Sequence, residues 1–242
     1  MKSLFLTVVL FALLLPLKVS AGTSFYLSGL FDRGLGSFAE KPNSPGTLLL
    51  HDGGVNVTRK VTTCLSTTTC GPELTSDETI IKIDAGRVYL RNLSTGKENS
   101  EAIVFANGNR VILARTIMFT DSLTIQNWEK QPPPGNIGKS YALAKLLSTE
   151  SGVLLHGSGS TGSIQISADG KSITRSLMIC IQECSMPTSG NFEITITPGK
   201  KAFFKNKETG AISENYVINA DHDAIVLYEK SSGIITVWTP TS

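Results

Sequence analysis

The chain repeats itself at a shift of about 115 residues, and this duplication limits the folds open to it more than any other feature. The clearest equivalences are cysteines, turn glycines and tryptophans that recur in the same order. In pairs, the recurring residues are Asn56 and Ser172, Cys64 and Cys180, Cys70 and Cys184, Ile81 and Ile194, Gly86 and Gly199, Asn92 and Asn206, Leu113 and Leu227, and Trp128 and Trp238. Each copy has about 110 residues, which is long enough to bury an independent core. We therefore expect two related modules.

The local pattern within each copy is that of β-strands. Thr79–Asp84 and Phe192–Thr197 alternate apolar and polar residues, as half-buried strands do, and a glycine-containing turn and a second apolar run follow each of them. Short strands at regular spacing predict an all-β protein of two tandem β-sandwich modules of the jelly-roll type. One stretch, Ser140–Leu147, has a helix-like composition instead.

The module boundaries follow from a proline-rich segment between the two copies. Residues 22–130 form the first predicted module and residues 140–242 the second, with a linker over residues 131–139 that contains three consecutive prolines. Proline-rich linkers are extended and semi-rigid. The modules should therefore be spaced apart unless a hydrophobic face joins them.

The first residues predict secretion. Lys2 precedes an apolar run over Leu4–Leu17, and a small residue, Ala21, ends the segment, so residues 1–21 are typical of a cleaved secretory signal. A membrane anchor is the alternative, but this run is shorter than the ~20 residues that cross a bilayer. No later stretch is apolar enough to span a membrane, so we expect a secreted, extracellular protein.

The charge balance argues against two classes of partner. Loss of Lys2 and Lys18 with the signal leaves 20 basic and 20 acidic side chains. A neutral, mixed surface does not favour nucleic-acid binding, which depends on clustered positive charge. It does not favour a polybasic membrane patch either.

The four cysteines are expected to form disulfides, because an even number in an oxidising compartment usually does. Four cysteines allow three pairings, and the duplication favours Cys64 with Cys70 and Cys180 with Cys184. These pairs would act as clips on tight loops. Redox activity is the alternative, but neither pair has the Cys-x-x-Cys spacing. A zinc site would usually need shorter spacing.

Two acceptor sequons are present, at Asn56-Val-Thr58 and at Asn92-Leu-Ser94. In a secreted protein such sequences predict glycosylated surface loops. We therefore expect a glycoprotein with glycans at Asn56, at Asn92 or at both.

Candidate chemical sites are few, and each fits a turn better. Asp221-His222-Asp223 could hold a metal ion, but Asn107-Gly-Asn109 lies at the equivalent place in the first copy, and such residues favour turns. The same interpretation applies to His51-Asp52-Gly-Gly54. Gly157–Gly162 matches a dinucleotide fingerprint, but a strand pattern follows where a helix is required. We expect no catalytic residue, metal or cofactor.

The order of motifs in each copy resembles that of secreted CUB-like modules of the nematode type. A paired-cysteine strand comes first, followed by Ile-x-Ile-x-x-Gly at Ile81 and Ile194, and then by an Asn-x-x-Thr-Gly turn. Each copy ends in Ile-x-x-Trp, at Trp128 and at Trp238. The resemblance implies a β-sandwich and an extracellular binding or defence-related role. The cysteine pairs lie closer together than in CUB domains, and no acidic calcium-site pattern is present, so calcium binding is not implied.

Three functions remain open from the sequence. The first is a secreted binding or adhesion protein whose tandem modules recognise a glycan or a protein at a cell surface, since duplication raises avidity. The second is a secreted hydrolase with a site near Asp221, His222 and His156. The third is an extracellular structural protein that associates with itself. The sequence specifies neither the ligand nor the oligomeric state.

Overall fold

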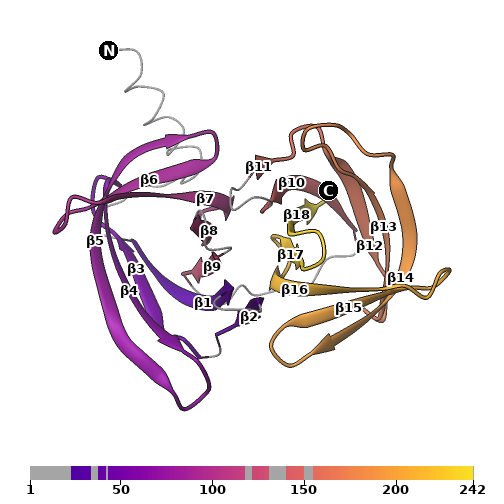
Figure 1. The fold of residues 1–242 in the computed structure, drawn as a ribbon, viewed down its shortest axis with the longest axis horizontal. Helices are drawn as coiled ribbons and strands as arrows, with labels where there is room; N and C mark the ends of the chain where they lie inside the picture. The colour runs from indigo at the N-terminus through magenta and orange to yellow at the C-terminus, as the bar shows by residue number, and fades with distance from the viewer. Residues whose placement is uncertain are drawn as a thin grey trace. The chain divides into compact units, whose positions relative to one another are not determined.

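The computed structural model describes residues 23–33, 38–41, 43–117, 122–130, 140–149 and 155–241. These residues form two compact units, and each unit is built from β-strands alone (Figure 1). No helix long and apolar enough to span a membrane occurs in the part of the chain that is described. The predicted signal, residues 1–21, and the predicted linker, residues 131–139, lie outside the described residues.

The first unit is a closed β-barrel. Its strands are β1 Thr23–Arg33, β2 Phe38–Glu40, β3 Gly46–Leu50, β4 Asn56–Cys64, β5 Cys70–Asp84, β6 Arg87–Asn92, β7 Glu98–Ala106, β8 Arg110–Ile117 and β9 Ser122–Glu129. Strands β1 and β3–β9 follow one another around a ring, and β2 adds to β1 outside it. The ring closes because β9 pairs antiparallel with β1, where Phe31 lies opposite Ile125.

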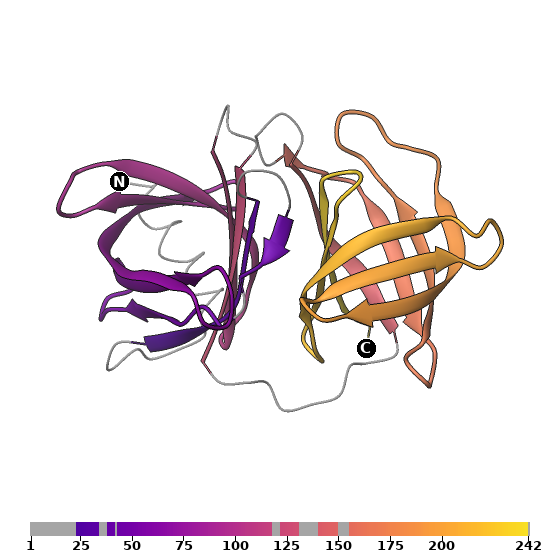
Figure 2. The ribbon, with the colours of Figure 1, turned by 60° about the horizontal axis from the view of Figure 1, so that its bottom comes forward.

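The second unit repeats this arrangement. Its strands are β10 Ser140–Ser148, β11 Leu155–His156, β12 Thr161–Ile166, β13 Ser172–Met178, β14 Thr188–Thr197, β15 Lys201–Asn206, β16 Ile212–Ala220, β17 Ile225–Glu229 and β18 Ile234–Pro240. Strands β10 and β12–β18 form the ring, which the antiparallel β10–β18 pair closes, and β11 adds to β10. In Figure 2 the strands of this unit curve around a common axis.

The expected pair of β-sandwiches, of jelly-roll or CUB-like type, is therefore wrong. A sandwich has two sheets with free edges, whereas each ring here has eight strands and no free edge between its first and last strands. Alternating strands and regular turns are common to both architectures. The difference lies in the β1–β9 and β10–β18 pairs, which join residues about 95 positions apart.

The helix-like stretch Ser140–Leu147 lies in strand β10. Its alanines and leucines have good helix propensity, but β10 pairs with both β12 and β18, and this tertiary context decides its conformation. Tyr141 and Leu146 are buried in the core of the second barrel.

The strand registers agree with the duplication. Trp128 lies opposite Leu27 in the first barrel, and Trp238 lies opposite Leu143 in the second. A β-bulge follows at the same place in each, directly after Leu27 and directly after Leu143. A bulge shifts the alternation of side chains by one residue, so shared bulges give the two barrels the same inward-facing positions.

The two disulfides join the predicted partners. Cys64 is bonded to Cys70 across the β4–β5 connection, and Cys180 is bonded to Cys184 directly after β13, at the equivalent place in the second barrel. No free cysteine remains. Both bonds close short loops, as expected of structural clips, and disulfides are typical of proteins in oxidising environments.

Removing the second clip should have a modest effect on stability. The double variant Cys180→Ala/Cys184→Ala is expected to lower the free energy of unfolding by about 2 kcal/mol, because a short loop restricts the unfolded chain only a little. Urea denaturation followed by circular dichroism measures this. A loss well above ~4 kcal/mol would mean that the bond holds the barrel together, contrary to its assignment as a clip.

Candidate functional site

An apolar cavity of about 240 Å³ lies inside the second barrel. Alternation along six strands, β12–β17, turns every second side chain inward, and these positions carry mostly branched apolar residues. The lining residues are Ile164, Ile166, Ile173, Ile194, Ile196, Ala202, Phe204, Val217, Ala220, Ile225 and Leu227, with Ser167, Ala168 and Gly170 of the β12–β13 turn. The only side-chain hydroxyl in this lining is that of Ser167, so the chamber favours an apolar occupant.

The two ends of the second barrel differ. At the cavity end, the β12–β13 turn borders the chamber, and Ile196 is 65% exposed there. At the opposite end, Ile179 and Ile181 of the disulfide loop pack against the core. The loop is held in place because the backbone N–H of Cys180 donates to Ser160 Oγ at 2.8 Å. The clip therefore helps to close the end of the barrel that lies away from the cavity.

A cationic side chain lies next to the chamber. Arg175 is on β13, two residues after the cavity residue Ile173 and on the same face, and it lies opposite Ile164 of β12. Its guanidinium is 5.1 Å from the centre of the Phe192 ring, a cation–π contact. Burial lowers the pKa of Arg175, and the negative charge of Glu229 opposes this shift. Arginine nevertheless stays charged.

The first barrel encloses a smaller apolar cavity, of about 90 Å³. Its lining residues are Phe25, Leu48, Leu50, Val57, Arg59, Ile80, Ile83, Val88, Leu90, Ile103, Ala106, Asn107, Val111 and Leu113. A water molecule occupies ~30 Å³ in the liquid, so this space is only a few water volumes in size. The second barrel therefore offers the larger chamber.

The interior of the first barrel has an ionic cluster around Arg59. The Arg59 guanidinium donates to both carboxylate oxygens of Glu101, at 2.8 and 3.1 Å, and to Gln126 Oε1 at 3.2 Å. Glu78 lies 3.3 Å from Arg59 Nη2. Arg59, Glu78 and Glu101 are all buried. Paired charges of this kind are costly to form but also costly to break.

The strand registers identify the equivalents of this cluster in the second barrel. In β4, Val57 lies opposite Glu78, and Arg59 follows two residues later. In β13, Ile173 lies opposite Phe192, and Arg175 follows two residues later, so Arg59 and Arg175 correspond. Glu78 lies opposite Asn92, and Phe192 lies opposite Asn206. Asn92 and Asn206 are matched positions of the repeat, so Glu78 and Phe192 correspond as well. By the same reasoning Asn215 replaces Glu101, since Asn215 pairs with Ala202 and Glu101 pairs with Val88. The second barrel keeps the arginine and lacks both carboxylates.

Burial raises the pKa of Glu78 above its ordinary value of 4.5. The charge of Arg59 lowers the pKa in part, and the negative charge of Glu101 raises it further. The folded barrel thus favours the protonated form of Glu78 more than the unfolded chain does. Between pH 4.5 and the pKa of Glu78 in the folded barrel, the unfolded chain binds fewer protons than the folded chain. The free energy of unfolding therefore falls as the pH rises through this range.

Glu78→Gln should weaken this pH dependence. The amide is permanently neutral, so the variant is expected to gain stability relative to the wild-type protein as the pH rises from 4 to 8. Urea denaturation at several pH values measures the difference. Glu208→Gln is the matched control, because Glu208 is exposed in the turn after β15 and its substitution should leave the profile unchanged. A parallel profile for Glu78→Gln and the wild-type protein would contradict the raised pKa assigned to Glu78.

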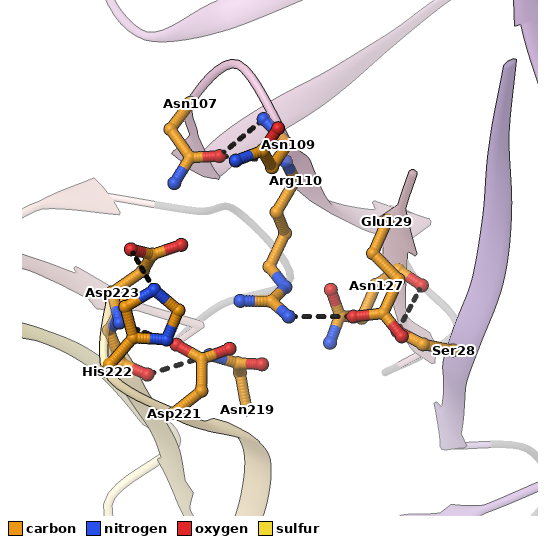
Figure 3. Close-up of polar contacts among 11 residues, drawn as sticks. Ser28, Asn107, Asn109, Arg110, Asn127, Glu129, Asn219, Asp221, His222 and Asp223 are labelled. Atoms are coloured by element: carbon orange, nitrogen blue, oxygen red, sulfur yellow. Dashed lines mark hydrogen bonds and ion pairs between the residues drawn. The ribbon is translucent and has the colours of Figure 1, made fainter. Parts of the chain in front are cut away.

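Asp221-His222-Asp223 forms a turn, as predicted. Asp221 Oδ1 accepts hydrogen bonds from the backbone N–H groups of Asp223 and Ala224, at 2.8 and 3.0 Å. Asn107 Oδ1 accepts equivalent bonds from Asn109 and Arg110 in the first barrel; Figure 3 draws both turns. The possible ligand atoms of the three residues lie within 4.8 Å of one another. Their arrangement follows from the turn, since the amide of the first copy makes the same two bonds.

The glycine-rich and histidine motifs also have structural explanations. Gly157–Gly162 leads into β12, which is a strand, so it lacks the helix N-terminus that a dinucleotide site requires. His51 lies in the β3–β4 turn, and its Nε2 is 2.8 Å from Thr58 Oγ1. These outcomes agree with the turn interpretation.

The residues of the hydrolase hypothesis do not come together. His156 pairs with Leu147, near the end of β10. The Tyr141 hydroxyl donates to the carbonyl oxygen of Asp221, near the start of the same strand. His156 and Asp221 therefore lie toward opposite ends of the second barrel.

The two sequon asparagines have different surroundings. Asn56 is exposed at the start of β4. Asn92 is half-buried at the end of β6, and its Oδ1 accepts hydrogen bonds from Ser94 and Thr95 within the following turn. Asn56 is therefore the more accessible of the two predicted glycan acceptors.

Arg59 and Arg175 are interior residues that were not predicted as such from the sequence. The pattern did contain a signal, because each arginine lies between inward apolar residues of an alternating strand: Val57 and Val61 in one copy, and Ile173 and Leu177 in the other.

The fold and cavity define a protein of two closed, eight-stranded antiparallel β-barrels, the second with an apolar chamber. No protein-family model matches the chain, and no curated protein sequence matches it. Among solved structures it is similar to a protein of unknown function from the DUF3598 family of Nostoc punctiforme, with 8% sequence identity and a TM-score of 0.35. That match covers 92% of this chain and 96% of the other.

Proposed function

We propose that the chain is a secreted binding protein whose second barrel holds a small, mainly apolar molecule. The observation that carries the proposal is the cavity of about 240 Å³ inside a closed barrel. Barrels of eight strands have interiors that either fill with side chains or hold one small ligand. The short side chains of Ala202 and Ala220 are among the residues that leave this interior unfilled.

The size and chemistry of the chamber limit its occupant. At ~30 Å³ for each water-sized group, the space takes roughly eight such groups, as in a medium-length hydrocarbon chain. Transfer of apolar surface from water into the chamber stabilises the complex by about 25 cal/mol per Å². The occupant is therefore a short-chain or medium-chain apolar molecule.

Binding of 1-octanol, measured by calorimetry, tests this proposal. The wild-type protein is expected to bind it, and Ala202→Phe should weaken binding at least about ten-fold, because the new ring fills the chamber. Ala211→Phe is the matched control, since Ala211 is exposed and should not affect binding. Absence of binding to the wild-type protein, or equal binding by both variants, would overturn the proposal.

Secretion and glycosylation are parts of the same proposal. The two disulfides support an oxidising, extracellular environment, in agreement with the signal-like residues 1–21. An apolar ligand carrier in such an environment would need an apolar surface for its ligand, and the lining of the chamber provides one. Recognition of a cell-surface glycan or protein, a defence-related role and self-association all stay predictions.

A further inference from the structure

The interior of the second barrel contains a cation without a carboxylate partner. Within the described residues, the Arg175 guanidinium makes no ion pair. It makes a cation–π contact with the ring of Phe192. Glu229 faces the same interior from β17 but lies beyond ion-pair distance, and its carboxylate accepts a hydrogen bond from Ser232. The side chain of Arg175 is half-buried, and charged groups that folding withdraws from water are usually paired, so an arginine without an ion pair beside a chamber requires an explanation.

The first barrel shows what structural pairing of this position looks like. There Arg59 is neutralised by Glu101 and Glu78. Both carboxylates are replaced in the second barrel, by Asn215 and Phe192, although the arginine is retained. An arginine kept only for packing would not need a charge, and one kept for an ion pair would need a carboxylate. The missing carboxylate can be supplied by a ligand.

The contact with Phe192 leaves the arginine suited to this role. A guanidinium that lies over the face of an aromatic ring can still direct parallel N–H groups to both oxygens of a carboxylate. Arg175 lies one inward position further along β13 than Ile173, which lines the chamber. A chain in the chamber would therefore direct one of its ends toward Arg175.

We propose that the chamber binds a medium-chain carboxylate, with its carboxylate against Arg175 and its hydrocarbon chain among the isoleucines. This inference rests on the proposed function and adds the chemistry of the head group. Octanoate and 1-octanol have the same chain length and differ at the head group, so they separate the two proposals.

Calorimetric titration with both molecules tests the inference. The wild-type protein is expected to bind octanoate at least about ten-fold more tightly than 1-octanol, because the carboxylate forms a hydrogen-bonded charge pair with the half-buried guanidinium of Arg175. Arg175→Met should reduce octanoate binding to the level of 1-octanol and leave 1-octanol binding unchanged. Arg91→Met, at an exposed arginine of the first barrel, should change neither.

Each possible outcome separates the two proposals. Equal affinity of the wild-type protein for octanoate and 1-octanol, or an equal loss of both in Arg175→Met, would overturn the head-group assignment and leave the apolar chamber intact. Absence of 1-octanol binding would overturn the proposed function itself. Should Arg175→Met fail to fold, the arginine Nε–H resonances of the wild-type protein decide: that of Arg175 should shift with octanoate and not with 1-octanol, and equal shifts would contradict the inference.

Discussion

Arg59→Met is expected to lower the free energy of unfolding of the first barrel by about 3–5 kcal/mol. The substitution removes the partner of two buried carboxylates, and an uncompensated buried charge is costly. Glu101 would be destabilised most, since it accepts two hydrogen bonds from Arg59. The chain has two tryptophans, one in each barrel. In a Trp238→Phe background, the fluorescence of Trp128 therefore reports unfolding of the first barrel.

Two controls separate charge pairing from the general effect of losing an arginine. Arg91→Met breaks an exposed ion pair with Glu98 and should cost no more than about 1 kcal/mol. Replacement of the whole cluster, Arg59→Met with Glu78→Gln and Glu101→Gln, should recover part of the loss, because no buried charge of the cluster remains. A loss below ~1 kcal/mol for Arg59→Met would show that the cluster contributes little to the barrel.

Trp238→Ala is the second substitution with a large expected effect, also about 3–5 kcal/mol. The ring is fully buried in the core of the second barrel, and its Nε1–H donates to Thr236 Oγ1 at 2.8 Å. Gly162 leaves room for it, since a Cβ there would lie 3.2 Å from the ring and 2.5 Å from the carbonyl oxygen of Ser176. Truncation of Trp238 would leave a cavity in the core of the second barrel, and the close packing around Gly162 limits how far the neighbouring strands can move to fill it.

Urea denaturation followed by circular dichroism measures this loss. Tyr26→Ala is the control, because Tyr26 is 57% exposed and its removal creates no cavity. It should cost well below 1 kcal/mol, as surface substitutions do. Similar stabilities for Trp238→Ala and Tyr26→Ala would contradict the central packing role assigned to Trp238.

Local features of the molecule were predictable from the sequence. Short-range alternation and turn residues define strands, and the repeat suggested which cysteines pair, so the all-β class and both disulfides agree with expectation. The Asp221 turn followed from its counterpart at Asn107, since both side chains make the same backbone hydrogen bonds.

Barrel closure was not predictable in this way. Whether a sheet closes depends on hydrogen bonds between its first and last strands, such as those around Phe31 and Ile125, and no local pattern encodes that pair. The chamber is equally non-local, because six strands contribute to it. The significance of Arg175 depends on residues of β14 and β16 that no longer provide carboxylates, and this is visible only after the two barrels are compared strand by strand.

Methyl NMR of the isoleucines during titration with 1-octanol shows whether the interior of the second barrel is a ligand chamber. Ile173 and Ile194 line the chamber, whereas Ile212 is 65% exposed. We predict saturable shifts of the Ile173 and Ile194 methyl resonances and none at Ile212. Shifts confined to isoleucines outside the lining, or no saturable shift at Ile173 and Ile194, would show that the interior does not hold the molecule.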